Sequence, residues 1–174
     1  DTFKNHSLVD FVIVVLPPNK KLHRNDVMTC TGGKSRSLSV YNGLLAAKSL
    51  SPDKVLIHDV ARPAVSEEII TDIINTIDDE TGAAPGLPVS DAIWKISNDE
   101  IEKTLDRDLI FRAQTPQGFP FSKILEAHEH KSDERAFDDV ELAKKFGLKV
   151  ILKTGHKDNM KITTPDHFLE MSKI

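Results

Sequence analysis

The chain has one cysteine, few aromatic residues and no long hydrophobic run, and these absences exclude several classes of protein. The single cysteine, Cys30, cannot form an internal disulfide, which favours a reducing compartment and predicts a cytoplasmic location. No apolar run is long enough to span a membrane and no signal peptide is visible, so no membrane partner is expected. The formal charge is −4, from 23 Lys and Arg against 27 Asp and Glu, without a dense basic run, so nucleic acid is not an expected partner.

Two common catalytic arrangements are also missing. No H-x-x-x-H or C-x-x-C pattern occurs, and His128 and His130, two residues apart, point to different sides of a helix, which argues against a zinc site. Ser35, Ser37 and Ser39 lack the G-x-S-x-G context of a nucleophilic serine, so serine-hydrolase chemistry has little support.

Apolar runs of strand length alternate with helical patterns, which predicts an α/β fold in a single domain of 174 residues. The spacing predicts strands over 11–16, 54–58, 83–89 and 149–153, and helices over 35–48, after Ser66, from Ser122 to about His130, from Asp138 to Gly147, and after Thr164. This alternation predicts a mostly parallel sheet covered by helices on both faces. A hairpin predicted within residues 92–112 interrupts the alternation, so we expect it to be an arm.

The most informative segment is VLIHDVARP at 55–63, where an apolar run ends at an acidic residue and an arginine follows. Ligands bind at the C-terminal ends of strands in open α/β sheets. There Asp59 could hold a metal ion and Arg62 a phosphate. The alternative is that Asp59 caps a turn beside a surface arginine, and the segment alone does not decide between the two.

Other segments offer weaker signals, each with a structural alternative. Gly32 and Gly33 precede a helix, where backbone can approach an anion closely, although a flexible loop with an ordinary cap fits equally well. Arg107 could clamp a phosphate or be a solvated arm residue. Thr115, held extended before Pro116, presents a hydroxyl.

Charged residues near the C-terminus are equally open. The pair Asp138-Asp139 could bind a metal, but two acids at a helix start more often serve the cap and the helix dipole. Lys161 could meet phosphates as a point charge, and by itself it reads better as a surface lysine.

Taken together and in this order, GGKSRSLSVYNGL, VLIHDVARP, RAQTPQGF and DNMKITTPD resemble the 2-C-methyl-D-erythritol 4-phosphate cytidylyltransferase family, from about Phe11 to the C-terminus. The RAQTPQGF form also resembles the cytidylyltransferase half of bifunctional proteins that carry a cyclodiphosphate synthase, so a fused or partner synthase is a further expectation. The resemblance implies a three-layer, Rossmann-like nucleotidyltransferase fold with a β-hairpin dimerisation arm. It implies transfer of CMP from CTP to methylerythritol phosphate, with release of pyrophosphate, in non-mevalonate isoprenoid precursor synthesis.

The resemblance also implies roles for individual residues. Gly33, Ser39 and Asp59 would bind the nucleotide, and Asp59 would be the ligand of Mg²⁺ or another divalent cation. Arg62 and Lys161 would be catalytic and would bind the acceptor phosphate, together with Thr115. Arg107, on the arm, would reach the site of the neighbouring subunit, which implies a homodimer with shared sites.

Three departures from the family pattern bear on the acceptor and on the N-terminus. Ala92 stands where the family commonly has Thr after an Asp, Lys95 comes one residue late, and Phe137 replaces a substrate-contacting Thr. The acceptor therefore stays open between methylerythritol phosphate and another polyol phosphate such as ribitol 5-phosphate. The family's glycine-rich triphosphate loop has no counterpart here, so we expect residues 1–174 alone not to transfer cytidylyl groups; a non-catalytic nucleotide-binding scaffold is the remaining alternative.

Overall fold

The computed structural model describes residues 1–130 and 138–171. Its helices are α1 (Thr2–Asn5), α2 (Arg36–Ala47), α3 (Glu67–Thr76), α4 (Phe121–Glu129), α5 (Asp139–Lys145) and α6 (Pro165–Met171), with short 3-10 turns η1 (Lys48–Leu50) and η2 (Arg107–Leu109). Its strands are β1 (Ile13–Leu16), β2 (Met28–Thr31), β3 (Lys54–Ile57), β4 (Thr81–Pro88), β5 (Ile93–Ser97), β6 (Glu100–Leu105), β7 (Phe111–Ala113), β8 (Gln117–Pro120) and β9 (Lys149–Thr154).

The main sheet is mixed, and this corrects the expectation of a mostly parallel sheet. Strand β4 pairs in parallel with β9, but β8 lies antiparallel to both β3 and β4, and β7 is also antiparallel to β4. Strands β7 and β8 follow the arm back along one edge of β4, which forces the antiparallel direction. A separate parallel pair, β1 with β2, lies outside this sheet.

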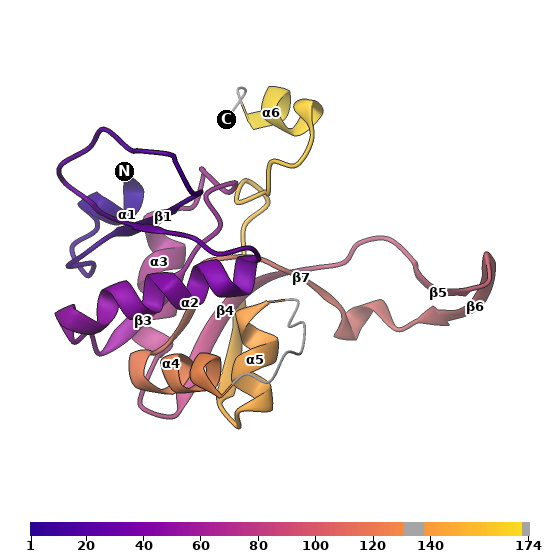
Figure 1. The fold of residues 1–174 in the computed structure, drawn as a ribbon. Coiled ribbons are helices and arrows are strands. Elements are labelled where there is room, and N and C mark those ends of the chain that lie inside the picture. Colours follow the sequence, from indigo (N-terminus) through magenta and orange to yellow (C-terminus); the bar gives the residue numbers. More distant parts are fainter. Residues whose placement is uncertain (131–137, 172–174) are drawn as a thin grey trace.

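Helices cover both faces of the main sheet, as the alternation of patterns predicts. On one face, residues of α2, α4 and α5 pack with Phe119 of β8 and Val55 of β3 in one buried cluster. On the other face, the isoleucines of α3 pack with Ala83 of β4 and Leu56 of β3. The two faces together give the three-layer α/β fold (Figure 1).

The local signals for helix ends hold at four of five positions, including Pro165, where α6 begins. The Ser66 hydroxyl accepts from Ile69 N–H at the start of α3, the Asp138 carboxylate accepts from Glu141 N–H at the start of α5, and Gly147 takes a φ of +90° after α5. The predicted cap at Ser122 is wrong: α4 begins at Phe121, directly after β8, without a side-chain cap. Phe121 N–H instead donates to the carbonyl of Asp53, so tertiary packing supplies the partner that a cap would give.

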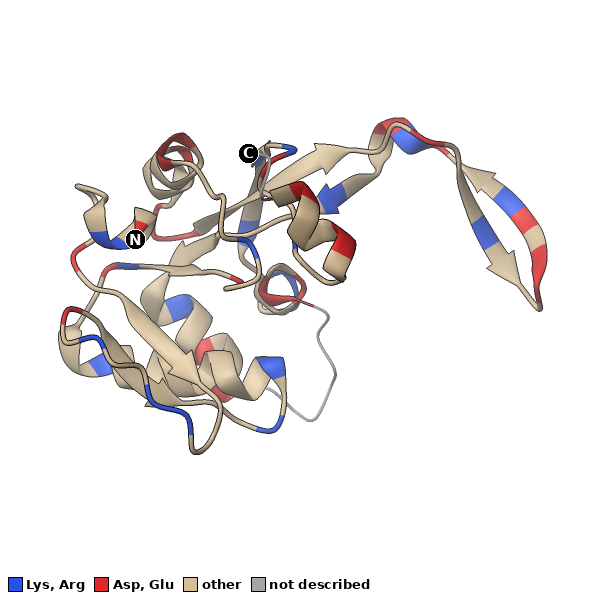
Figure 2. Cartoon of the chain, turned by 90° about the horizontal axis from the view of Figure 1, so that it is seen from above, with Lys and Arg blue, Asp and Glu red and all other residues tan. Residues whose placement is uncertain are grey.

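The predicted hairpin exists as β5 and β6, and it extends away from the rest of the fold (Figure 1). Its two-residue turn, Asn98-Asp99, has positive φ at both positions, the backbone that tight hairpins favour. The hairpin carries charges of both signs (Figure 2), yet Trp94, Ile96 and Ile101 are each more than half exposed. An isolated hairpin that exposes such side chains has only marginal stability in water, so burial of this apolar surface would stabilise it.

Within residues 1–130 and 138–171, no helix combines the length and the apolar composition needed to cross a bilayer.

Candidate active site

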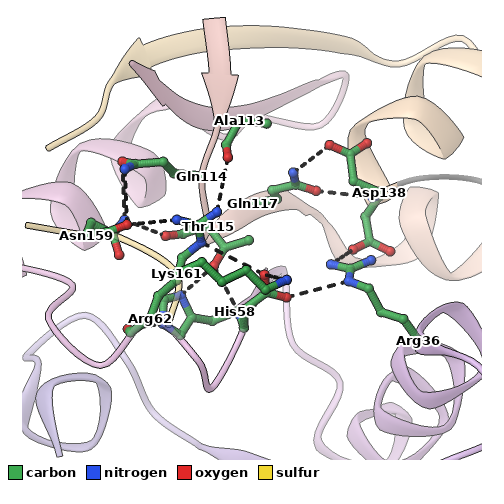
Figure 3. Close-up of polar contacts among 12 residues, drawn as sticks. Arg36, His58, Arg62, Ala113, Gln114, Thr115, Gln117, Asp138, Asn159 and Lys161 are labelled. Atoms are coloured by element: carbon green, nitrogen blue, oxygen red, sulfur yellow. Dashed lines mark hydrogen bonds and ion pairs between the residues drawn. The ribbon is translucent and has the colours of Figure 1, made fainter. Parts of the chain in front are cut away.

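The centre of the site is the carboxylate of Asp59, two residues beyond the end of β3. Three cationic side chains, Arg36, Arg62 and Lys161, converge on it, and Figure 3 shows these three cations close together. The Nζ of Lys161 lies 2.8 Å from Asp59 Oδ2, and Arg36 Nε lies 3.6 Å from Oδ1. Arg62 Nε lies 3.9 Å from Oδ2. Burial opposes ionisation of the Asp59 carboxyl, but Lys161, Arg36 and Arg62 outweigh it and lower its pKa. Asp59 is therefore ionised at neutral pH and ready to meet a cation.

A hydrogen-bonded chain fixes the backbone of Asp59. His58 Nε2 lies 3.0 Å from the carbonyl of Arg62, which can only accept, so Nε2 carries the proton. Burial lowers the pKa of His58, which favours the neutral ring, so Nδ1 accepts from the Thr115 hydroxyl at 3.0 Å. The same hydroxyl oxygen accepts from Asp59 N–H at 3.1 Å. Thr115 is buried, and its hydroxyl proton is already donated to His58.

Arg62 ties two loops together in this structure. Its Nη1 donates to the carbonyl of Asn159 at 2.8 Å and its Nη2 to the carbonyl of Ala113 at 3.2 Å. Its Nε is buried without a hydrogen-bond acceptor among the described residues and faces Asp59. Burial, partly offset by Asp59, lowers the pKa of the guanidinium. Arg62 therefore keeps one donor directed at the site while the others hold its walls.

Two buried amides hold the loop that carries Lys161. Gln114 Nε2 donates to the carbonyls of His156 and Asn159, at 2.9 and 3.1 Å, and its Oε1 accepts from His156 N–H at 3.1 Å. Asn159 Nδ2 donates to the carbonyl of Thr115 at 2.8 Å. These bonds join the Lys161 loop to the break between β7 and β8, so Lys161 approaches Asp59 from a fixed base.

The glycine-rich segment before α2 forms a small cavity with the end of β1. The cavity, of about 200 Å³, is lined by Val15, Leu16, Pro17, Pro18, Gly32, Gly33 and Ser39. The Ser39 hydroxyl accepts from Gly33 N–H at 3.1 Å and donates to the carbonyl of Ser35 at 2.9 Å, so it shapes the loop. A Cβ at Gly33 would overlap the side chain of Leu38, which explains the need for glycine there.

The structure brings Asp59, Arg62, Thr115 and Lys161 together, with Gly33 and Ser39 in the adjoining loop. Arg107 lies apart from them, in η2 at the base of the arm, where Nη1 donates to the carbonyl of Ser90 at 2.7 Å. Phe137 lies outside the described residues, and Ala92 lies in the bend before β5. Among the described residues, then, a single chain brings these predicted residues together and leaves Arg107 apart from them.

Sequence reasoning missed Arg36 and the part played by Asp139. Arg36 Nη2 lies 2.7 Å from Asp139 Oδ2, and His128 Nε2 lies 3.2 Å from Asp139 Oδ1. A signal existed for Arg36, because it is the first residue of α2 and a cation is unfavourable at a helix N-terminus. An arginine at the positive end of the α2 dipole needs carboxylate partners to stabilise it, and only the tertiary structure shows which carboxylates these are.

The donor set at Asp59 suits one kind of metal site. Among the residues that the structure describes, no group of three or more His, Cys, Asp or Glu could hold a metal ion by itself. Mg²⁺ keeps several waters and binds through one or two carboxylates together with substrate phosphates. A single ionised carboxylate surrounded by cations therefore fits a divalent cation shared with a phosphate ligand, and not a centre made by protein side chains alone.

A three-layer α/β fold with a charged strand end beside a glycine-lined cavity is typical of enzymes that bind nucleotides. The family model of 2-C-methyl-D-erythritol 4-phosphate cytidylyltransferase (IspD) matches residues 1–174. The chain belongs to this family of cytidylyltransferase enzymes.

Relatives and solved structures agree with this assignment. The chain is 46% identical over 149 residues to the bifunctional enzyme IspD/IspF of Ruegeria sp. (strain TM1040), covering 86% of the chain and 39% of that protein. It is 39% identical over 177 residues to the 2-C-methyl-D-erythritol 4-phosphate cytidylyltransferase of Roseobacter denitrificans, covering 99% of the chain and 79% of that protein. The crystal structure of the enzyme from Thermus thermophilus superposes with a TM-score of 0.86 at 30% identity, covering 95% of the chain and 84% of that chain.

Proposed function

We propose that this chain is part of the catalytic domain of an enzyme that transfers CMP from CTP to 2-C-methyl-D-erythritol 4-phosphate, releasing pyrophosphate in non-mevalonate isoprenoid precursor synthesis. The observation that carries the proposal is the cluster of Lys161, Arg36 and Arg62 around Asp59, next to the cavity at Gly33. Nucleotidyl transfer depends on positioning and on neutralising phosphate charge, and this cluster offers both.

The cavity provides the place for the nucleoside. Its lining is mostly apolar, from the end of β1 to Pro18, and it offers backbone at Gly32 and Gly33 without intervening side chains. Apolar walls with backbone polar groups suit a nucleobase, and the Ser39 hydroxyl keeps the loop in shape. The phosphates of a nucleotide bound here would run toward Asp59, since Arg36 connects the start of α2 to that carboxylate.

At the reacting phosphates, the chain contributes one anion, Asp59, and one movable cation, Lys161. Asp59 would hold a Mg²⁺ ion, which when bound neutralises phosphate charge. Lys161, almost half exposed, exchanges its contact with Asp59 for a phosphate oxygen and orients the acceptor. No covalent bond to the protein is required, because the acceptor phosphate oxygen attacks the α-phosphorus and pyrophosphate leaves.

The acceptor side belongs to Arg62, whose Nε faces the site, with Thr115 beneath it. We assign Arg107 to the site of a second subunit, because it lies at the base of the exposed arm and apart from Asp59 in its own chain. A homodimer that covers Trp94 and Ile101 would bring this about. The relative from Ruegeria sp. (strain TM1040) is a bifunctional enzyme IspD/IspF, so a cyclodiphosphate synthase fused to this domain is a further part of the proposal. We also propose a cytoplasmic location, which the single free cysteine supports.

The test is to incubate the full-length protein with CTP, Mg²⁺ and either 2-C-methyl-D-erythritol 4-phosphate or ribitol 5-phosphate, and to measure pyrophosphate release. We expect release with the methylerythritol phosphate at least about tenfold faster than with ribitol 5-phosphate. Faster release with ribitol 5-phosphate would reassign the acceptor, and CTP binding without release for either acceptor would leave a nucleotide-binding scaffold. Omission of Mg²⁺ is the control for metal dependence.

A further inference from the structure

Asp139 is a buried carboxylate that helix capping does not explain. The cap of α5 is Asp138, whose carboxylate accepts from Glu141 N–H at 2.9 Å. Asp139 comes next, with its side chain 2% exposed, against Arg36 on one oxygen and the buried ring of His128 on the other. A charge this buried is tolerated only with partners, and it has two. Its position is therefore tied to what those partners do.

The Arg36 guanidinium lies between two carboxylates, those of Asp139 and Asp59. Nη2 lies 2.7 Å from Asp139 Oδ2, and Nε lies 3.6 Å from Asp59 Oδ1, so the nearer partner is Asp139. Burial works against the charged guanidinium, but the two carboxylates prevail and raise its pKa. A guanidinium has a rigid planar fork, so fixing one edge fixes the direction of the others. Asp139 thus sets how closely Arg36 can approach Asp59.

We infer that Arg36 is a positioning residue for Asp59, and that the buried pair of Asp139 and His128 restrains Arg36 so that Asp59 stays available to a divalent cation. The inference rests on the proposed function, in which Asp59 holds that cation. Arg36 attracts Oδ1 and orients the carboxylate, but its closer ion pair with Asp139 limits this attraction. Without Asp139, Arg36 would pair fully with Asp59 and compete with the metal. Without Arg36, Asp59 would lose a competing cation but also its orientation.

This arrangement predicts opposite metal affinities for two variants of the full-length protein. Arg36→Gln should bind Mn²⁺ roughly threefold more tightly, and Asp139→Asn roughly threefold more weakly, which is the range for partly exposed ion pairs. Both should lower kcat at saturating Mg²⁺ by roughly tenfold, because Asp59 is misplaced in both. The double variant should match Arg36→Gln alone, since Asp139 acts only through Arg36.

The measurement is a Mn²⁺ titration at saturating CTP, followed by the water proton relaxation enhancement of protein-bound Mn²⁺, with Asp59→Asn as reference. Thermal melts identify any variant that fails to fold. If Asp139→Asn fails to fold, Arg36→Lys is measured in its place. Arg36→Lys should keep a Mn²⁺ affinity close to that of wild type and lose kcat, because the positive charge remains and the planar guanidinium is lost.

The outcomes distinguish a failure of this inference from a failure of the proposed function. Wild-type binding by Asp59→Asn would overturn both the metal role of Asp59 and this inference. If Asp59→Asn loses binding while Arg36→Gln and Asp139→Asn shift the affinity in the same direction, or not at all, the inference is overturned and the proposed function stands. Equal losses of affinity and thermal stability in all variants would show a structural role only, which also overturns it.

Discussion

Replacing Asp59 with Asn separates the chemistry of the site from its contribution to folding. The amide keeps the shape of the carboxylate and removes its charge. Lys161, with 43% of its side chain exposed, can return to water. Arg36 keeps Asp139, and Arg62 keeps its two carbonyl acceptors. None of the three cations is therefore stranded in a dry environment when the carboxylate is lost.

The structure gives the size of both effects. Loss of a partly exposed ion pair lowers the free energy of unfolding by about 1 kcal/mol or less. For a domain of this size that corresponds to a fall in the thermal midpoint of about 2–4 °C. Turnover should fall by at least about 100-fold, since an electrostatic group at a transition state contributes about 3 kcal/mol.

The assay combines pyrophosphate release with thermal melts, and Asp72→Asn is the matched control. Asp72, on α3 and outside the site, forms an ion pair with Lys153 Nζ at 2.9 Å. Loss of the Asp72 charge should therefore change stability by a similar amount and leave turnover intact. Because the pKa of Asp59 is lowered by folding, the stability difference between wild type and Asp59→Asn in EDTA should be full above about pH 4 and vanish as the pH falls through that lowered pKa. Turnover within about threefold of wild type, or a midpoint more than about 10 °C lower, would refute the reasoning.

Three further predictions concern the arm, the core and pH. Trp94→Ser combined with Ile101→Ser should convert a dimer into a soluble monomer in sedimentation velocity, because the exposed apolar face of the hairpin is removed; a monomeric wild type would contradict this. Gly118→Ala should lower the free energy of unfolding by about 1–3 kcal/mol in urea melts, because a Cβ there would lie 2.5 Å from Ile73 Cγ2. Burial lowers the pKa of His58, so wild type should lose stability as the pH falls below about 6.5, and His58→Gln should show a flatter profile; parallel profiles would rule out this role.

Local chemistry made several elements predictable. The run before His58 has the apolar character of a buried strand, and β3 is found there. The isoleucines after Ser66 recur at helical spacing, and α3 buries them. The Asn98-Asp99 pair between apolar runs marks a tight hairpin turn, and both residues take positive φ. Each signal depends on neighbours within one or two turns, so the sequence alone was enough.

The antiparallel strands β7 and β8 could not be found in the same way. Their segment contains Pro116 and Gly118, which weaken any strand pattern, and both strands are defined by partners far along the chain. The break between them places Gln114 and Thr115 against the Asn159 loop and Asp59. Pairing of this kind is decided by tertiary packing and leaves no local periodicity.

The sequence by itself determined the family and the apolar strand that ends shortly before Asp59, and it singled out Arg62, Thr115 and Lys161 as candidates, because motif order and apolar periodicity are properties of the linear chain. Only the tertiary structure decided that Arg36 shares its charge between Asp59 and the buried Asp139. It also decided that the Thr115 hydroxyl donates its proton to His58. Charge pairing and hydrogen-bond direction depend on distances between residues remote in sequence, and those distances exist only once the sheet and its helices have packed.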